Sequence, residues 1–185
     1  MRVIRVSFLA LFFVFSLTCQ AADSFSLSSP TIKDGGQLSM DQVGSGFGCS
    51  GKNISPALAW KNAPQGTKSF AVTVYDPDAP TGSGWWHWMV VNLPATAHQL
   101  AEGAGEPSGK ALPAGARPIR VDSGQAVFSG ACPPIGDKPH RYIFTVYALK
   151  TDKLELPADA TAAMAGFMIH AETIAKASFT AYYGR

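Results

Sequence analysis

The segment from Ser69 to Asp76 alternates with the two-residue period of a β-strand, yet both of its faces are mostly apolar. Two further segments, 87–93 and 140–149, show the same two-sided pattern. Strands of this kind need cover on both faces, which a sheet packed on another sheet or beneath loops provides. Weaker strands are expected at 24–28, 57–60 and 178–183. The chain is therefore predicted to be mainly β, with sheets packed as a sandwich.

One segment, 159–177, breaks the strand pattern because it is rich in Ala and Met. Its larger apolar residues recur at roughly helical spacing: Met164, Phe167, Met168, Ala171 and Ile174. Asp159 is the expected N-cap. We predict a single amphipathic helix here, laid against the sandwich.

The composition favours short strands and fixed turns over a helical bundle, because only 15% of residues are charged and the chain holds 18 Gly and 13 Pro. A net charge of +2 with dispersed Lys and Arg excludes a nucleic-acid footprint. No linker divides the chain, so residues 23–185 are predicted to form one domain.

The N-terminal residues 1–22 have the pattern of a secretory signal peptide. Arg2 and Arg5 precede an apolar run, 6–17, that is too short to span a bilayer. A lipid-anchored start at Cys19 is the competing interpretation. No other stretch is long and apolar enough to cross a membrane, so a periplasmic or secreted protein is expected.

Two cysteines, Cys49 and Cys132, remain after the expected cleavage. An oxidising compartment favours joining them, and we predict a disulfide between them. The alternative is a pair of buried thiols.

Polar residues gather at the predicted strand ends. Asp76 ends one strand and His87 begins the next, so an antiparallel pair would bring both to the same end of a sheet. A hydrogen bond from His87 to Asp76 would then fix the imidazole tautomer. In the competing interpretation, Asp76 and Asp78 only cap the turn that begins at Pro77.

A second group follows the turn 136–139. His140 and Tyr142 lie on the same face of the predicted strand and can share a pocket, whereas Arg141 points the other way. Arg141 is therefore expected to clamp neighbouring loops through carboxylates or carbonyls.

Several of these segments together resemble the phosphatidylethanolamine-binding proteins, in particular their bacterial Raf-kinase-inhibitor-like branch. The similar segments are Asn53-Ile54-Ser55-Pro56-Ala57-Leu58 with Trp60, Asp76-Pro77-Asp78-Ala79-Pro80-Thr81-Gly82, Trp86-His87-Trp88 with Val90-Val91-Asn92, Gly130-Ala131-Cys132-Pro133-Pro134, and His140-Arg141-Tyr142. Their order and spacing agree with the family over nearly all of the predicted mature chain.

The resemblance implies an antiparallel Greek-key β-sandwich with few helices and a small pocket for phosphate-like anions. By the same resemblance, the ligand-binding residues would be Asp76, Asp78 at the pocket edge, His87, Gly130, Pro133, Pro134, His140 and Tyr142. The chain departs from the family pattern at Val121-Asp122-Ser123-Gly124, where relatives commonly show an Asn-Asp-Phe-Gly type segment. The loop facing the pocket is expected to differ in shape there.

Three classes of function are compatible with these residues. The first is a non-catalytic module that binds a small phosphorylated or otherwise anionic group, without a cofactor or metal. The second is a protein-interaction role, such as inhibition of a protease or a signalling partner. The third is a metal-dependent hydrolase using Asp76, Asp78, His87 and His140, although the chain has no His-Glu-x-x-His run and no Gly-x-Ser-x-Gly elbow. Formation of a homodimer is left open.

Overall fold

The computed structural model describes residues 24–185, so the predicted signal peptide lies outside the described residues. The strands are β1 (Ser26–Ser28), β2 (Leu58–Lys61), β3 (Ser69–Asp76), β4 (Trp85–Pro94), β5 (Gln99–Leu100), β6 (Arg117–Pro118), β7 (His140–Leu149) and β8 (Thr173–Tyr183), and helix α1 spans Ala162–Glu172.

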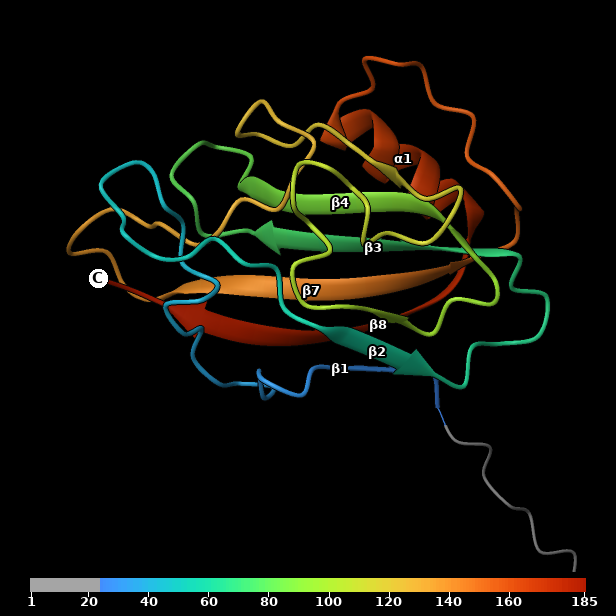
Figure 1. Ribbon diagram of the computed structural model, residues 1–185, viewed down its shortest axis with the longest axis horizontal. Helices are drawn as coiled ribbons and strands as arrows, with labels where there is room; N and C mark the ends of the chain where they lie inside the picture. Colours follow the sequence, from blue (N-terminus) through green and yellow to red (C-terminus); the bar gives the residue numbers. More distant parts are fainter. Residues whose placement is uncertain (1–23) are drawn as a thin grey trace, which may run out of the picture.

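The strands form two antiparallel sheets (Figure 1). The larger sheet has the order β6-β4-β3-β7-β8, and the smaller one has the order β1-β2-β5. The predicted fold class is confirmed, since the described chain is mainly β with two antiparallel sheets and a helix near its C-terminal end.

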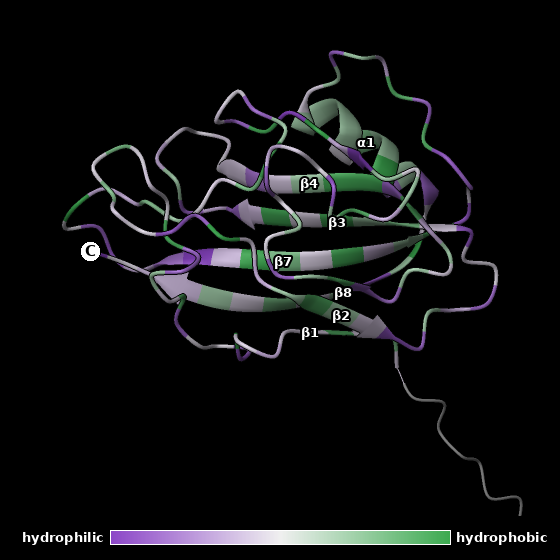
Figure 2. Cartoon of the chain, in the orientation of Figure 1, coloured by the Kyte–Doolittle hydropathy of each residue, from purple (hydrophilic) through white to green (hydrophobic). Residues whose placement is uncertain are grey.

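Both faces of the larger sheet are buried, as the two-sided strand pattern predicts. One face packs on the small sheet through side chains such as Phe70, Trp88 and Phe144. The opposite face packs beneath α1 and nearby loops through Met89 and Leu149. Figure 2 shows the resulting hydrophobic stretches along β3, β4 and β7. Two buried apolar layers hold the sheet rigidly in place, and its polar residues lie at the strand ends.

Helix α1 differs from the prediction in its bounds, its cap and its buried face. The N-cap is Thr161, whose hydroxyl accepts from Met164 N, and not Asp159. Met164 and Phe167 are 48% and 73% exposed. The buried residues are Ala162, Ala165, Gly166 and Ile169. Small residues face the sheet because they let the helix approach it closely.

The helix is also shorter than predicted, because residues 173–177 belong to β8. They pair with the end of β7, where Thr173 lies opposite Leu149 and Ala177 opposite Val146. Hydrogen bonding along β7 therefore overrides a local sequence that has reasonable helix propensity.

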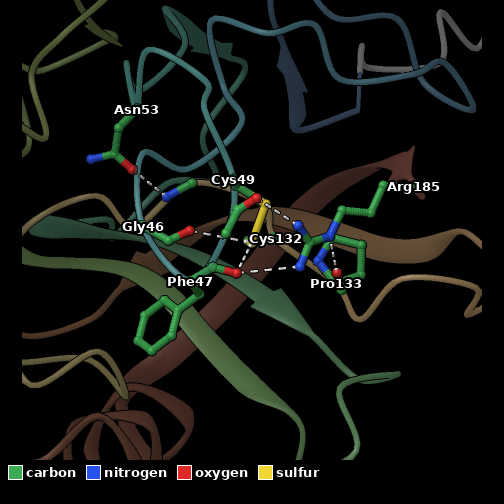
Figure 3. Close-up of a disulfide and its surroundings, with 9 residues drawn as sticks. Gly46, Phe47, Cys49, Asn53, Cys132, Pro133 and Arg185 are labelled. Atoms are coloured by element: carbon green, nitrogen blue, oxygen red, sulfur yellow. Dashed lines mark hydrogen bonds between the residues drawn. A yellow bond between two sulfur atoms is a disulfide. The ribbon is translucent and has the colours of Figure 1, made fainter.

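A disulfide joins Cys49 and Cys132, whose sulfur atoms are 2.10 Å apart, so this prediction is confirmed (Figure 3). The bond links two loops that lie next to each other without it, because Gly44 N donates to Ala131 O at 2.9 Å. Within residues 24–185, no helix combines the length and apolar character needed to span a membrane.

Removing the disulfide should destabilise the fold. For a sequence separation of 83 residues, the chain-entropy model gives a ceiling of about 4–5 kcal/mol. We expect the double variant Cys49→Ala/Cys132→Ala to lose less than this ceiling, because other contacts hold the same loops together. Chemical denaturation of both proteins measures the difference. An unchanged midpoint would show that the bond does not stabilise the fold.

Candidate functional site

The larger sheet brings three strand ends to one place. β3 is central, and it pairs antiparallel with β4 on one side and with β7 on the other. The last residue of β3 therefore lies beside the first residues of both neighbours, as the register of Asp76 with Trp85 and of Tyr75 with Ile143 shows. The loops that join these strand ends gather at the same end of the sheet as the C-terminus (Figure 1).

A cavity of about 380 Å³ opens among these strand ends and loops. The predicted ligand-binding residues that line it are Asp76, His87, Gly130, Pro133, Pro134, His140 and Tyr142. Asp78 does not line it and lies on the outer side, with Arg141 and Asp137. The two imidazoles, His87 and His140, thus meet at one cavity, as expected from their positions near strand ends.

Asp76 pairs with His140 and not with His87, so the predicted partner was wrong. Its Oδ2 lies 2.8 Å from His140 Nδ1, while its Oδ1 accepts from Asp78 N at 2.8 Å. Both side chains of this hydrogen-bonded pair are almost fully buried. Asp76 therefore caps the turn with one oxygen, as the competing interpretation predicts, but it does not only cap, because its other oxygen orients an imidazole, that of His140.

His87 is held by the backbone of Ser129. Its Nδ1 lies 2.6 Å from Ser129 O, and because a carbonyl only accepts, Nδ1 carries the proton. Burial lowers the pKa of His87, against weaker opposing effects from Ser129, Asp76 and Asp122. The ring is therefore neutral at pH 7, and Nε2 is an acceptor without a hydrogen-bond partner among residues 24–185.

His140 lies between two carboxylates. Its Nδ1 contacts Asp76, and its Nε2 lies 3.4 Å from Asp137 Oδ2. The ring is thus oriented from both sides at the start of β7.

Tyr142 has a hydroxyl with no hydrogen-bond partner among the described residues and almost no contact with water. The ring lies edge-on to His87 with centroids 5.1 Å apart. Burial, with the nearby Asp76 charge, raises the pKa of Tyr142, so the phenol stays protonated. A buried hydroxyl without a partner is costly to the fold, so it would gain from any acceptor that comes within its reach.

Asp78 and Arg141 form a fork-to-fork pair outside the cavity. Arg141 Nη2 donates to Asp78 Oδ1 at 2.7 Å, and Nε donates to Oδ2 at 2.9 Å. Arg141 N also donates to Oδ2 at 2.9 Å. The predicted clamp by Arg141 therefore holds the turn after β3 against the start of β7.

The loop wall of the cavity requires glycine at position 130. A Cβ there would lie 2.6 Å from both Gln42 O and Gly44 N, which are backbone atoms that cannot move aside. Gly130 N also donates to Asn53 Oδ1 at 2.7 Å. The following Pro133 and Pro134 extend this wall as a rigid turn.

Arg185 and Phe47 were not predicted, although both line the cavity. Arg185 donates to Pro133 O at 2.6 Å, to Gly48 O at 2.9 Å and to Phe47 O at 3.3 Å, as Figure 3 shows. It therefore bridges the two loops that the disulfide joins. The sheet register is what places Arg185 here, because Tyr183 pairs with His140 and the residues that follow it reach the cavity.

No group of three or more His, Cys, Asp or Glu side chains within residues 24–185 is arranged to hold a metal ion.

The Asp78–Arg141 pair predicts an acid-dependent contribution to stability. Hydrogen bonds from Arg141 lower the pKa of Asp78 from 3.8 to about 2. The folded protein therefore binds this proton less readily than the unfolded chain, so stability is gained above pH 3.8 and lost as the pH falls towards 2. In denaturant titrations, wild type should have a higher free energy of unfolding than Asp78→Asn above pH 3.8. This difference should shrink as the pH falls from 3.8 towards 2.

The matched control is Asp152→Asn, because Asp152 is exposed and lies 3.7 Å from Lys68. This variant should show no comparable narrowing. A gap for Asp78→Asn that is constant with pH would contradict the prediction.

Comparison with known proteins agrees with the resemblance seen in the motifs. The family model described as phosphatidylethanolamine-binding protein matches residues 28–184. The YbcL protein of Escherichia coli strain K12 is 54% identical over 183 residues, covering 99% of this chain and 98% of YbcL. The YbhB protein of the same strain is 51% identical over 158 residues, covering 85% of this chain and 98% of YbhB.

A crystal structure of E. coli YbcL, described as a new member of the mammalian PEBP family, matches the fold with a TM-score of 0.85 and 55% identity. The match covers 87% of this chain and 98% of the YbcL chain. This chain therefore belongs to the phosphatidylethanolamine-binding protein family.

Proposed function

We propose that this protein is an exported, non-catalytic binding protein whose cavity takes a small anion, namely phosphate or a phosphoryl head-group. The observation that carries the proposal is that His87, His140 and Tyr142 line one cavity, and that the Tyr142 hydroxyl has no hydrogen-bond partner among the described residues. The name of the family supports a phosphoryl-bearing ligand.

Tyr142 and Arg185 supply the donors that an anion needs at neutral pH. The Tyr142 hydroxyl is protonated and unpaired. Arg185 uses three contacts on backbone carbonyls, which leaves two of its five N–H groups and its positive charge for a ligand. Hydrogen bonds to an ionised acceptor are stronger than neutral ones, so few such donors suffice.

Asp76 is already engaged by hydrogen-bond donors of the protein. One of its oxygens contacts the His140 ring and the other accepts from Asp78 N. Its role in the proposed site is to orient His140, which lies at the same cavity.

A binding role is favoured over hydrolysis because the groups suited to catalysis are already engaged. Cys132 is bonded to Cys49, and the Asp76 carboxylate has both oxygens occupied. His87 keeps a free acceptor nitrogen, yet no nucleophilic side chain among the described residues hydrogen-bonds to it.

Export is supported by two features. The N-terminal residues have a signal-like pattern, and the Cys49–Cys132 bond needs an oxidising compartment to form and persist. A periplasmic or secreted location follows for the proposed binding protein.

A protein-interaction role is the second candidate, favoured by two apolar side chains near the cavity. Phe47 is 82% exposed and Ile135 is 80% exposed. Large exposed apolar groups are frequent in interaction surfaces. His87→Ala separates the two roles, because it should weaken anion binding below about pH 7 and leave the binding of a protein partner unaffected.

Anion affinity should rise as the pH falls. A bound anion favours the protonated ring of His87, whose pKa is lowered by burial in the free protein, so binding takes up a proton. Sulfate is the suitable probe because it stays fully ionised. We expect calorimetry to show tighter sulfate binding from about pH 8 to about pH 5.5, by at most about tenfold per pH unit for one proton.

The control for this experiment is His87→Gln, which keeps a polar side chain but does not titrate. Its sulfate affinity should be nearly independent of pH. The proposal is contradicted by a wild-type affinity that is flat or that rises with pH, and a retained slope in His87→Gln would assign the proton to another group.

The variant Tyr142→Phe should change stability and binding in opposite directions. Removing an unpaired buried hydroxyl leaves the free energy of unfolding unchanged or raises it by about 1 kcal/mol. Removing a donor to a charged ligand should weaken sulfate binding by about tenfold or more. Denaturant titration and calorimetry on the same sample measure both. Unchanged sulfate affinity would exclude Tyr142 from the site.

A further inference from the structure

A second hollow, of about 300 Å³, lies directly beside the cavity. We call it the groove, and it is bordered by Ser45, Phe47, Asn53, Ser123, Gln125 and Ser129 among others. The groove and the cavity share Phe47, Ser129, Gly130 and Cys132, so a single wall separates them. Ligand atoms can therefore extend from one hollow into the other over this wall.

The groove differs from the cavity in its chemistry. No Asp, Glu, Lys, Arg or His side chain is among its lining residues. It offers hydroxyls and amides that both donate and accept, together with the face of Phe47, which is 82% exposed. An uncharged partner with several hydroxyls matches this lining, because it avoids the cost of desolvating a charge.

Ser123 is the group in the groove that most clearly lacks a partner. Its Oγ is buried from water and makes no hydrogen bond with any described residue. It stands in the loop 121–124, at the border of the groove. A small side chain at this position leaves the groove open, and an unpaired buried hydroxyl is costly to the folded protein until it gains a partner.

The wall between the two hollows is fixed in place. Asn53 donates to Phe128 O at 3.1 Å and accepts from Gly130 N at 2.7 Å. Ser129 O accepts from His87, and Ser129 N donates to His87 O at 2.8 Å. Phe47 has a φ of 54°, a conformation that bulky residues rarely adopt, so its loop is held in a defined shape. The spacing of the two hollows is therefore set before any ligand arrives.

We propose that the groove is a second subsite, which receives the uncharged, hydroxyl-bearing part of a phosphate ester whose phosphoryl group lies in the cavity. This inference rests on the proposed anion-binding function. The ligand class is a sugar or polyol phosphate, whose hydroxyls bond to the serine and glutamine side chains while its carbon face lies on Phe47.

Calorimetry with three probes tests the subsite at one fixed pH: inorganic phosphate, glucose 1-phosphate and butyl phosphate. The wild type should bind glucose 1-phosphate about tenfold more tightly than the other two, as expected for a few additional hydrogen bonds. Ser123→Phe fills the groove, and it should remove this advantage without changing the affinity for inorganic phosphate. Ser123→Ala keeps the groove open, and it should lose only a few-fold in affinity for the sugar phosphate.

Equal affinities of the wild type for all three probes, tighter binding of butyl phosphate, or an advantage that survives in Ser123→Phe would each overturn the subsite. In these outcomes binding of inorganic phosphate persists and the proposed function stands. Failure of all three probes to bind would overturn the proposed function and the subsite with it.

A measurement on the wild type avoids dependence on how Ser123→Phe folds. In NMR titrations, glucose 1-phosphate should shift the amide signals of Ser45, Ser123 and Gln125, whereas inorganic phosphate should leave them in place. Identical shift patterns for the two ligands would overturn the subsite.

Discussion

The candidate site depends on the buried carboxylate of Asp76 and its two hydrogen bonds. One oxygen holds the turn that leaves β3 through Asp78 N, and the other holds the His140 ring at the start of β7. Because the carboxylate is only 2% exposed, its charge is tolerable only while both donors remain. The donors are in turn positioned by the pairing of β3 with β7. Sheet register, turn shape and ring orientation are thus linked through one side chain.

The opposite side of the cavity is built from loops, and different kinds of bond hold it. The disulfide joins the loops covalently, Arg185 bridges their carbonyls, and Asn53 binds the backbone on either side of Ser129. Gly130 lets the two backbones approach more closely than any side chain would allow. Rigid strand ends therefore face a rigid loop wall, and the cavity between them is held in shape, which reduces the conformational entropy that the protein must lose when a ligand binds.

The strands of the large sheet were predictable because burial on both faces leaves a strong alternating pattern, and the bounds of β3 and β7 agree with the sequence. The partner of Asp76 was not predictable, because β3 lies between β4 and β7 and chain order says nothing about which neighbour supplies the imidazole. Helix α1 was predicted too long because helix propensity depends on local sequence alone and does not include the pairing of Thr173 with β7. Arg185 was missed since only the sheet register brings it to the cavity.

Under the proposed function, the polar atoms of the cavity that have no partner among residues 24–185 constrain the ionic form of the ligand. The Tyr142 hydroxyl and the remaining Arg185 N–H groups suit acceptor oxygens, whereas the neutral His87 ring presents an acceptor nitrogen. A fully ionised phosphate has no proton to offer that nitrogen, so two acceptors would face each other. Either the ligand enters as a singly protonated acid or the ring takes up a proton as the ligand binds. Both routes couple binding to one proton, and both arise from the same cause, namely that Ser129 O fixes the tautomer of His87 before any ligand is present.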